Sequence, residues 1–240
     1  MESIPYFTLP LAIQFKKEER KLITIKNTVD VKYQLINTFS IVAIDPITDA
    51  CGAAVASKFP AVGKVVPYVR AGVGAFCTQH QHNPAWGEEA LDLLDCGGLP
   101  EEVLAHLLRD DPNSGKRQLA IIDMQGRTAT RNPVDADSSS AWWGGISGKF
   151  YACQGNTLVG PNVVTAMAAA YEFTKGSLSD RLMAALVAGD QAGGDHRGRL
   201  AAGLRVASSN SEDIALDVDE SDDAVMELHQ KYINIPHDLF

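Results

Sequence analysis

The segment from residue 38 to residue 87 constrains the fold more than any other part of the chain. It begins with TFSIVAID, turns at PITD and returns as CGAAVAS, which together predict a β-hairpin. Its side chains are mostly small, and only 7% of all residues in the chain are aromatic. We therefore expect neighbouring elements to approach one another closely instead of enclosing a bulky core.

The order of the predicted elements indicates an α+β protein. In chain order these are strands at 38–45, 51–57 and 73–78, helices at 86–95 and from 100 onward, strands at 118–123 and 127–130, a polar loop at 132–148, a strand at 150–153, helices at 161–175 and 179–192, strands at 200–208 and 214–218, and a helix at 222–231. Strands and helices alternate in blocks, which favours antiparallel sheets layered with helix pairs over a doubly wound parallel sheet. The even spread of apolar residues favours one large domain over two small ones.

Charge and hydropathy argue against two classes of partner. The chain carries a net charge of −9, and its only basic cluster lies at residues 16–21. Phosphate binding needs clustered Lys and Arg, so we expect neither a nucleic-acid partner nor an anionic membrane surface. No apolar run approaches the roughly 20 residues that a transmembrane helix requires.

The cysteines indicate a reducing compartment. Cys51, Cys77, Cys96 and Cys153 show no C-x-x-C spacing and lie in apolar contexts. We interpret them as buried reduced thiols in preference to disulfides or metal ligands. This usage predicts a cytoplasmic protein.

Residues 1–36 differ from the rest of the chain, since they contain the basic cluster and no Gly. An acid and two prolines near the start do not suit a secretory signal. Three explanations stay open: a removable propeptide, a poorly ordered extension, or an upstream stretch added by a wrongly chosen start codon. We therefore predict an extension at 1–36, poorly ordered or removable, and a domain at 37–240.

Two histidines and one charged turn have competing interpretations. His80 and His82 would share one face of a strand, but no acidic or Cys partner is spaced to complete a metal site, so surface or loop histidines are preferred. We expect no metal and no cofactor. Asp195 and Arg197 follow two glycines, and the turn holds either a salt bridge or an Arg that clamps a substrate carboxylate.

Thr38 stands at the head of the first strand, where a specific chemistry is conceivable. If the chain were cut before it, one residue would supply a nucleophilic hydroxyl and, in its free α-amine, the base that activates it. Ser57 and Lys58 lie in the second strand, where neighbours point to opposite faces, so only one of them can face such a site.

Five motifs, in this order and spacing, resemble the prokaryotic family catalogued as domain of unknown function 1028. They are TFSIVAIDP, VASKFPAVG, TQHQHNPAWG, QGNTLVG and GGDHRG, and the resemblance extends from residue 38 to about residue 228. It implies membership of the N-terminal-nucleophile (Ntn) hydrolase superfamily. The implied fold is a four-layer αββα sandwich with two antiparallel sheets between helix layers, in agreement with the predicted order of elements.

The resemblance also implies roles for individual residues. Thr38 takes the place of the nucleophile, Lys58 that of the cation that lowers the proton affinity of the amine, and Asn156 that of an oxyanion donor. The residues implied in substrate binding are Ser57, Gln79, Asn83, Gln154, Asp195 and Arg197. In this chain Thr38 follows Asn37, so the mechanism requires cleavage of the Asn37–Thr38 bond.

The leading hypothesis is therefore an Ntn-type amidohydrolase that acts on a small amide or peptide-like metabolite, with Thr38 as nucleophile once it is exposed. The alternative is a non-catalytic Ntn-like domain that binds a ligand or assembles with other copies. Homo-oligomerisation is left open.

Overall fold

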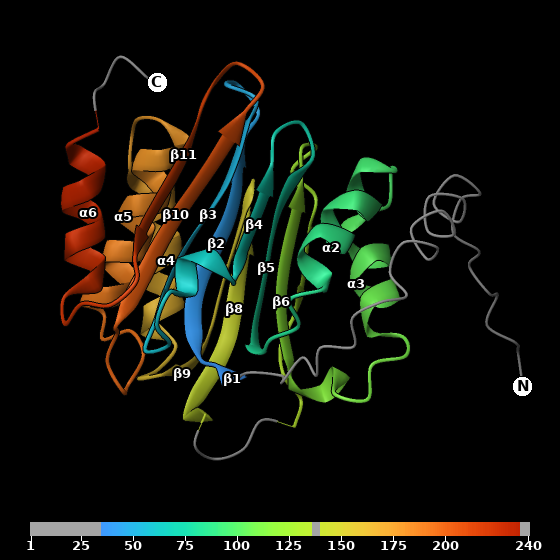
Figure 1. The fold of residues 1–240 in the computed structure, drawn as a ribbon, viewed down its shortest axis with the longest axis horizontal. Helices are drawn as coiled ribbons and strands as arrows, with labels where there is room; N and C mark the ends of the chain where they lie inside the picture. Colours follow the sequence, from blue (N-terminus) through green and yellow to red (C-terminus); the bar gives the residue numbers. More distant parts are fainter. Residues whose placement is uncertain (1–34, 136–139, 236–240) are drawn as a thin grey trace, which may run out of the picture.

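Two antiparallel β-sheets lie face to face at the centre of the structure (Figure 1). The computed structural model describes residues 35–135 and 140–235. The larger sheet has six strands in the order β11-β10-β3-β2-β9-β8, and every neighbouring pair is antiparallel. Its strands are β2 (Thr38–Asp45), β3 (Ala50–Ser57), β8 (Trp142–Gly148), β9 (Tyr151–Leu158), β10 (Ala201–Ser208) and β11 (Ser211–Val218).

The smaller sheet has five strands arranged around β5 (Gly74–Gln81). One edge of β5 pairs with β1 (Leu35–Ile36) and then with β4 (Pro67–Arg70). Its other edge pairs with β6 (Arg117–Asp123), which pairs in turn with β7 (Thr128–Arg131). Two short 3-10 helices, η1 (Val62–Lys64) and η2 (Ser114–Lys116), connect strands of this region.

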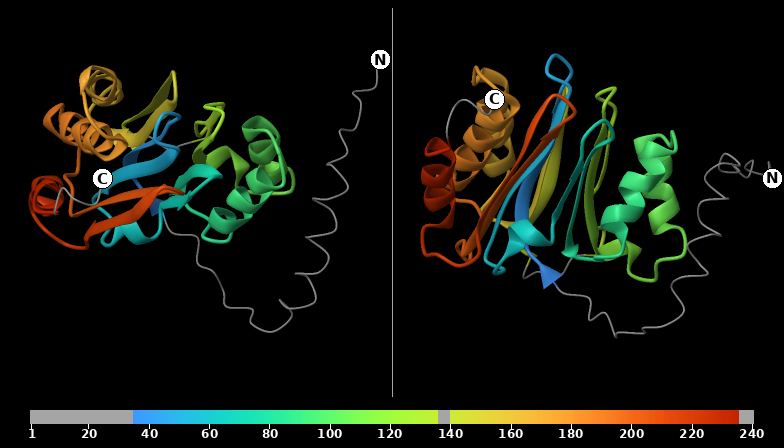
Figure 2. Two further views of the ribbon diagram at one scale, coloured as in Figure 1. Left: turned by 90° about the horizontal axis from the view of Figure 1, so that it is seen from above. Right: turned by 45° about the horizontal axis from the view of Figure 1, so that its top comes forward.

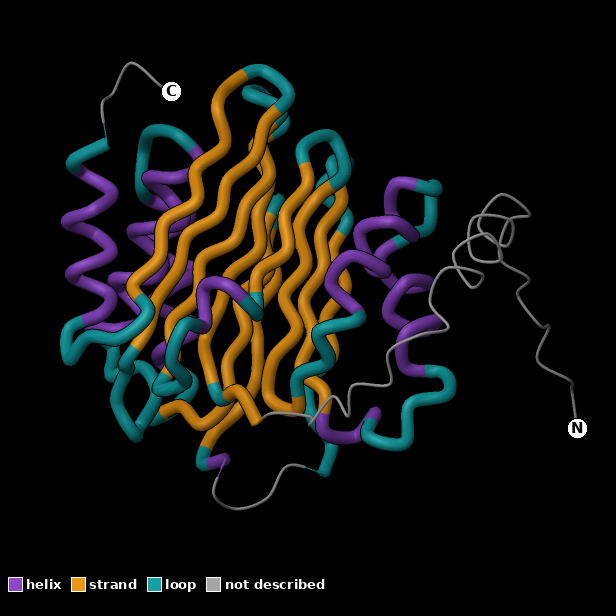
Figure 3. Tube along the Cα trace, viewed as in Figure 1, coloured by secondary structure: helices purple, strands orange, loops and turns teal. Residues whose placement is uncertain are grey.

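Helices cover the outer face of each sheet, which gives four layers (Figures 2 and 3). The helices α4 (Asn162–Phe173), α5 (Leu178–Gln191) and α6 (Ala224–Ile233) lie on the larger sheet. The helices α2 (Trp86–Asp95) and α3 (Pro100–Leu108) lie on the smaller one. Three separate clusters of buried apolar residues fill the three interfaces between these layers.

Strand β2 lies between β3 and β9, and both of its faces are covered. Phe39 and Ile41 pack with the helix layer, whereas Val42 and Ile44 pack against the other sheet. Successive side chains of a strand point to opposite faces, and both faces of β2 are covered. All eight residues of β2 are therefore buried. The central run IVAI of β2 is apolar, as burial on both faces favours.

Local signals set the helix ends. Pro100 occupies the first turn of α3, where its missing N–H has no partner to lose. The Ser177 hydroxyl caps α5 by accepting a hydrogen bond from the Asp180 N–H at 3.2 Å, and the Asp180 carboxylate accepts one from the Ser177 N–H at 2.9 Å.

The predicted α+β sandwich and the order of its elements are confirmed, and the strand that begins at Thr38 lies in the interior of the larger sheet. The loop predicted at 132–148 is wrong in its second half, because 142–148 form β8. β8 is an edge strand rich in Gly and partly exposed, so it lacks the apolar alternation that marks a buried strand. The short strand β4 was also not predicted.

The boundary predicted after residue 36 falls within ordered chain. Leu35 and Ile36 form β1, and Ile36 is fully buried in the core between the sheets. The ordered domain therefore includes these two residues. The expectation of a poorly ordered or removable extension concerns residues 1–34, which lie outside the described residues, and it stays a prediction.

The helices within residues 35–135 and 140–235 are all too short or too polar to cross a membrane.

Two glycines allow η1 to lie directly on the larger sheet. A Cβ added to Gly203 in β10 would clash with the Cα atom of Gly63 and would lie 3.1 Å from the Asp217 carboxylate. A Cβ added to Gly63 would in turn lie 2.8 Å from the Gly203 Cα. The contact is between two backbones, so neither side can yield by moving a flexible side chain.

We expect Gly203→Ala to lower the free energy of unfolding by about 1–3 kcal/mol, because the added methyl overpacks this contact. Chemical denaturation followed by circular dichroism measures the loss. The matched control is Gly160→Ala, since a Cβ at Gly160 meets no atom within 4 Å. Equal stability of the two variants would contradict the backbone contact.

Candidate functional site

One end of the space between the sheets is polar, while the rest of it is apolar. Seven buried, uncharged side chains meet there, and we call them the amide cluster: Thr38, Ser40, Ser57, Gln79, Gln118, Gln154 and Asn156. The apolar remainder includes Val42, Val55 and Ala120 from the same strands. A polar end in an otherwise apolar interface is a candidate site, because burying polar groups is unfavourable unless they are paired.

Strand alternation brings the cluster together. Thr38 and Ser40 share the face of β2 that carries Val42, and Ser57 shares the face of β3 that carries Val55. Thr38 and Ser57 are also direct partners in the β2–β3 ladder. The other members come from β9, β5 and β6, so five strands and both sheets contribute.

Gln118 is the centre of the cluster. Its Oε1 accepts hydrogen bonds from Gln79 Nε2 and Asn156 Nδ2, both at 2.8 Å. Its Nε2 donates to the Gly155 carbonyl at 2.8 Å and to Asn132 Oδ1 at 3.0 Å. One β6 side chain thus joins the smaller sheet to β9 of the larger one.

Gln79 connects the cluster to β2. Its Nε2 donates to the Thr38 carbonyl at 3.2 Å, and its Oε1 accepts a hydrogen bond from the Ser40 hydroxyl at 2.6 Å. Gln154 Nε2 donates to the same Ser40 oxygen at 3.4 Å. The backbone of Thr38 is therefore held by the cluster.

Some polar atoms at this end have no hydrogen-bond partner within residues 35–135 and 140–235. They are Thr38 Oγ1, Gln154 Oε1 and Asn37 Oδ1, all buried. An unpaired buried polar atom lowers the stability of the fold by about 1–3 kcal/mol, so such atoms are uncommon in protein interiors. Thr38 thus has a fixed backbone and an uncommitted hydroxyl.

The peptide bond before Thr38 is also held. Ile36 pairs with β5 of the smaller sheet and Thr38 with β3 of the larger sheet, so Asn37 alone spans the two sheets. The Ser57 hydroxyl donates to the Asn37 carbonyl at 2.5 Å and accepts from the Phe59 N–H at 2.8 Å. Ser57, the ladder partner of Thr38, therefore donates a hydrogen bond to the carbonyl oxygen of the Asn37–Thr38 peptide bond.

Asp195 and Arg197 lie in the loop that crosses the Thr38 end of the larger sheet. The loop donates from the His196 N–H to the Thr157 carbonyl at 3.0 Å in β9, and from the Leu200 N–H to the Ser57 carbonyl at 2.7 Å in β3. Asp195 is buried and accepts two hydrogen bonds from the Arg197 side chain. Of the two interpretations, the structure contains the salt bridge, with the Arg197 side chain still 37% exposed.

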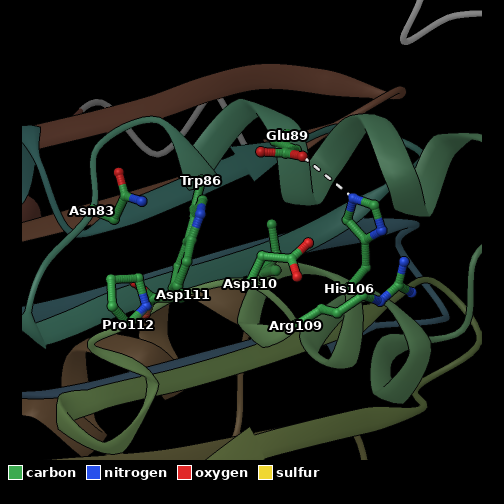
Figure 4. Close-up of a pocket in the computed structure, with 9 residues that line it drawn as sticks. Asn83, Trp86, Glu89, His106, Arg109, Asp110, Asp111 and Pro112 are labelled. Atoms are coloured by element: carbon green, nitrogen blue, oxygen red, sulfur yellow. Dashed lines mark ion pairs between the residues drawn. The ribbon is translucent and has the colours of Figure 1, made fainter.

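Two predicted site residues lie apart from the amide cluster. Lys58 follows β3 directly and is exposed. Asn83 precedes α2, and its Oδ1 accepts a hydrogen bond from the Ala85 N–H at 3.2 Å. Asn83 lines a separate hollow of about 380 Å³ over α2 and α3, together with Trp86 and Glu89 (Figure 4).

Sequence reasoning missed Ser40 and Gln118. Ser40 stands two residues after Thr38, so alternation places it on the same face of the strand. Gln118 directly precedes the apolar run LAII of β6, where an amide predicts a hydrogen-bonded interior position. Both signals were present, but neither shows that the two strands meet across the sheets.

Burial makes three of the four cysteines poor candidates for a nucleophile. All four are free thiols, and three of them are buried. Burial raises the pKa of Cys77, which faces the other sheet, to about 12. The reactive form is the thiolate, so Cys77 is inert at neutral pH.

The two histidines of the QHQH segment are both buried, so the expectation of surface or loop histidines is wrong. No cluster of three or more metal-ligating side chains occurs in the described part of the chain. His82 Nε2 lies 2.7 Å from the Val65 carbonyl oxygen, to which it can only donate. Burial lowers the pKa of His82 to about 4, and the Arg117 charge adds to that effect against the opposing Val65 bond. His82 is thus a neutral interior residue.

Two comparisons with known proteins relate the chain to the same family. A family model described as "Family of unknown function (DUF1028)" matches residues 38–228. The chain is similar to a protein from Silicibacter pomeroyi whose crystal structure is described with the same family model. The two sequences are 30% identical, and the two structures superpose with a TM-score of 0.76. The match covers 82% of this chain and 88% of that one. No functionally curated protein matches the chain.

We expect Gln118→Leu to lower the free energy of unfolding by about 3–5 kcal/mol, because the Gln79 and Asn156 amides lose their shared acceptor at a buried position. Denaturant unfolding measures the change. Gln230→Leu, on the exposed face of α6, is the matched control and is expected to change stability by less than about 0.5 kcal/mol. A similarly small effect at Gln118 would show that the cluster does not join the sheets.

We also expect His82 to make stability depend on pH. The unfolded histidine titrates near its ordinary pKa of 6.5 and the folded one near 4. Between these values the unfolded state binds the proton first, so stability is complete above about pH 6.5 and is lost as the pH falls towards 4. The loss is on the order of 2–3 kcal/mol. His82→Gln keeps an N–H donor for Val65 and should remove this part of the pH dependence in melts at pH 7 and pH 5.

Proposed function

The chain belongs to the family of unknown function DUF1028, and we propose that in this protein the family's domain is an Ntn-type amidohydrolase with Thr38 as its nucleophile. The observation that carries the proposal is the state of Thr38. Its backbone is fixed by Gln79, while its buried hydroxyl has no partner among the described residues. The family match also begins at this residue.

The proposed reaction uses the two ends of one residue. Once Thr38 is the first residue of its chain, its α-amine, with a pKa near roughly 8, is partly neutral at physiological pH and can accept the hydroxyl proton. Thr38 Oγ1 then attacks the substrate carbonyl carbon, and the amine passes the proton to the leaving nitrogen. Water hydrolyses the acyl-threonine and restores the hydroxyl.

The amide cluster provides the surroundings for this reaction. Asn156 Nδ2 has two N–H groups, of which Gln118 takes one, so the second can donate to the oxyanion. Gln154 Oε1 is an uncommitted acceptor for a substrate N–H. The cluster carries no charge, which suits a small neutral amide or peptide-like substrate.

Other residues take supporting roles in the proposal. Lys58 follows the ladder partner of Thr38, and there its charge would lower the proton affinity of the amine. Ser57, Asp195 and Arg197 border the end of the sheet at which substrate would enter. Asn83 lines a separate hollow, so its part in substrate binding is the least supported.

Cleavage before Thr38 is part of the proposal, and Ser57 supports it. Thr38 Oγ1 would attack the Asn37 carbonyl carbon, the C–N bond would break as the amine takes up the proton, and water would hydrolyse the resulting ester. The Ser57 hydroxyl already donates to the Asn37 carbonyl oxygen, where negative charge would develop.

One observation favours the alternative, a non-catalytic domain that binds a ligand or assembles with other copies. Ile36 is fully buried, so the strand before Thr38 is anchored in the core. While that connection persists, Thr38 has no free amine and its hydroxyl is enclosed. The uncleaved chain therefore fits this second function better.

The proposal keeps the cytoplasmic setting. All four cysteines are unpaired thiols, as a reducing compartment would maintain them.

Intact-mass analysis of the purified full chain tests the proposal first. We expect a species that begins at Thr38, and we expect Thr38→Ala to stay uncleaved. Ser57→Ala should slow cleavage by about 100-fold or more, the low end of the effect of one oxyanion donor. The control is Thr78→Ala, which removes another buried hydroxyl that has no partner among the described residues and lies on the opposite face of β5.

Hydrolysis of small chromogenic anilides tests the chemistry. Thr38→Ala should abolish hydrolysis without changing the circular dichroism spectrum, and Thr38→Ser should retain part of it because the hydroxyl is kept. Activity in a chain that still carries residues 1–37, or full activity in Thr38→Ala, would exclude the N-terminal mechanism and favour the binding domain.

A further inference from the structure

One outer edge of the larger sheet is exposed and uncharged. β8 is the last strand in the order of that sheet: it pairs with β9 on one side, and its other side meets no strand within residues 35–135 and 140–235. Every residue of β8 is at least partly exposed. Because the peptide groups of a strand point alternately to its two sides, β8 presents a row of N–H and C=O groups along this open side.

The other outer strands of the described chain have features that prevent an exposed edge from pairing. Charged side chains and a short length are two such features. β11 contains Glu212, Asp213 and Asp217. β4 and β7 have four residues each and contain Arg70 and Arg131, and β1 has two residues. β8 has seven residues and contains neither a charged residue nor a proline.

Most of β8 is a regular strand with small side chains. A β-bulge shifts its register between Trp142 and Gly144, and from Gly144 to Gly148 the ladder with β9 is regular. This regular part has the sequence GGISG, in which Ile146 is the one large residue. Glycine in a strand often marks a place where another backbone approaches closely, because no side chain stands in the way.

The composition around this edge is that of a protein–protein interface. Two of the three tryptophans in the chain, Trp142 and Trp143, belong to β8, and both are only partly buried. α4 packs on β8 and contains one charged residue, Glu172, whose carboxylate accepts a hydrogen bond from the Tyr151 hydroxyl at 2.7 Å. Aromatic residues are enriched and charged residues depleted at the centre of interfaces. The edge therefore indicates a protein partner.

We propose that the β8 strands of two copies of this chain pair antiparallel about a twofold axis, so that two six-stranded sheets join into one of twelve strands. Charge identifies a second copy as the partner. Each chain carries a net charge of −9, so two copies repel one another over most of their surfaces. Pairing along β11 would bring acidic side chains of both copies together, whereas pairing along β8 brings no like charges together.

Antiparallel pairing also satisfies the symmetry of a dimer. Across a twofold axis each strand meets the same strand running in the opposite direction, so the contact closes at two copies and covers both open edges. When the regular parts overlap fully, Ile146 lies opposite Ile146 of the second copy, and Gly144 lies opposite Gly148. Lys149, in the turn after β8, lies beyond the overlap, with its ammonium 4.9 Å from the centre of the Phe150 ring.

Sedimentation velocity of the full chain over a range of protein concentrations tests the proposal. We expect a species with the mass of two copies. Ser147→Glu places a carboxylate on an exposed position of β8 in both copies, so it should raise the dissociation constant of the dimer by at least about tenfold. The matched control Ser211→Glu makes the same change on exposed β11 and should alter the constant by less than about twofold, because salt screens exposed charges far from the interface.

Hydrogen exchange measured by mass spectrometry locates the pairing. The N–H groups on the open side of β8 are hydrogen-bonded in the dimer, so they should exchange faster when the wild-type protein is diluted below the dissociation constant found by sedimentation. Peptides that span Ser211–Val218 of β11 should exchange at the same rate at both concentrations. If Ser147→Glu does not fold, as judged by circular dichroism, this comparison within the wild type still decides whether β8 pairs.

Thr38→Ala separates this proposal from the amidohydrolase, since Thr38 lies in β2 and not at the edge of the sheet. That variant should lose anilide hydrolysis and still form the dimer. A folded wild-type chain with the mass of one copy at every concentration would overturn the pairing and leave β8 to an extended peptide of another protein. A dimer unaffected by folded Ser147→Glu, or exchange in β8 that does not change on dissociation, would also overturn it.

Discussion

The hydrogen bonds of Gln118 across the two sheets are the interaction on which the rest of the structure depends. Both polar atoms of this one side chain are used, with the oxygen towards Gln79 and Asn156 and the nitrogen towards the backbone of β9. Fully paired amides can lie inside a core at little net cost, whereas half-paired ones cannot. This pairing makes a polar end possible in an interface whose remainder is apolar. Through Gln79 it also holds the backbone of Thr38, the first residue of β2.

The start of β2 concentrates the chemistry of the molecule. Asn37 connects the two sheets, Ser57 donates to its carbonyl, and Thr38 presents a hydroxyl that nothing in the described chain satisfies. One end of the sandwich therefore holds both the candidate nucleophile and the peptide bond that precedes it.

Much of the candidate site was predictable residue by residue, but its connections were not. Thr38, Ser57, Gln79, Gln154 and Asn156 were singled out from motifs, and the structure places all five in one cluster. Ser40 and Gln118 were overlooked because an isolated Ser or Gln in a strand carries no sign of its cross-sheet partner. Lys58 and Asn83 stand in equally specific motifs, yet they lie outside the cluster, because a motif records sequence neighbourhood and not the direction of a side chain.

The sequence by itself determined the α+β class and the order of the elements. These follow from local periodicity, turn residues and helix caps, which act over a few residues. Only the tertiary structure decided that 142–148 form an edge strand, that Ile36 anchors the chain before Thr38, and that Gln118 meets Gln79 and Asn156. Each of these depends on contacts between segments far apart in the chain, whose energies are realised only once both sheets have formed.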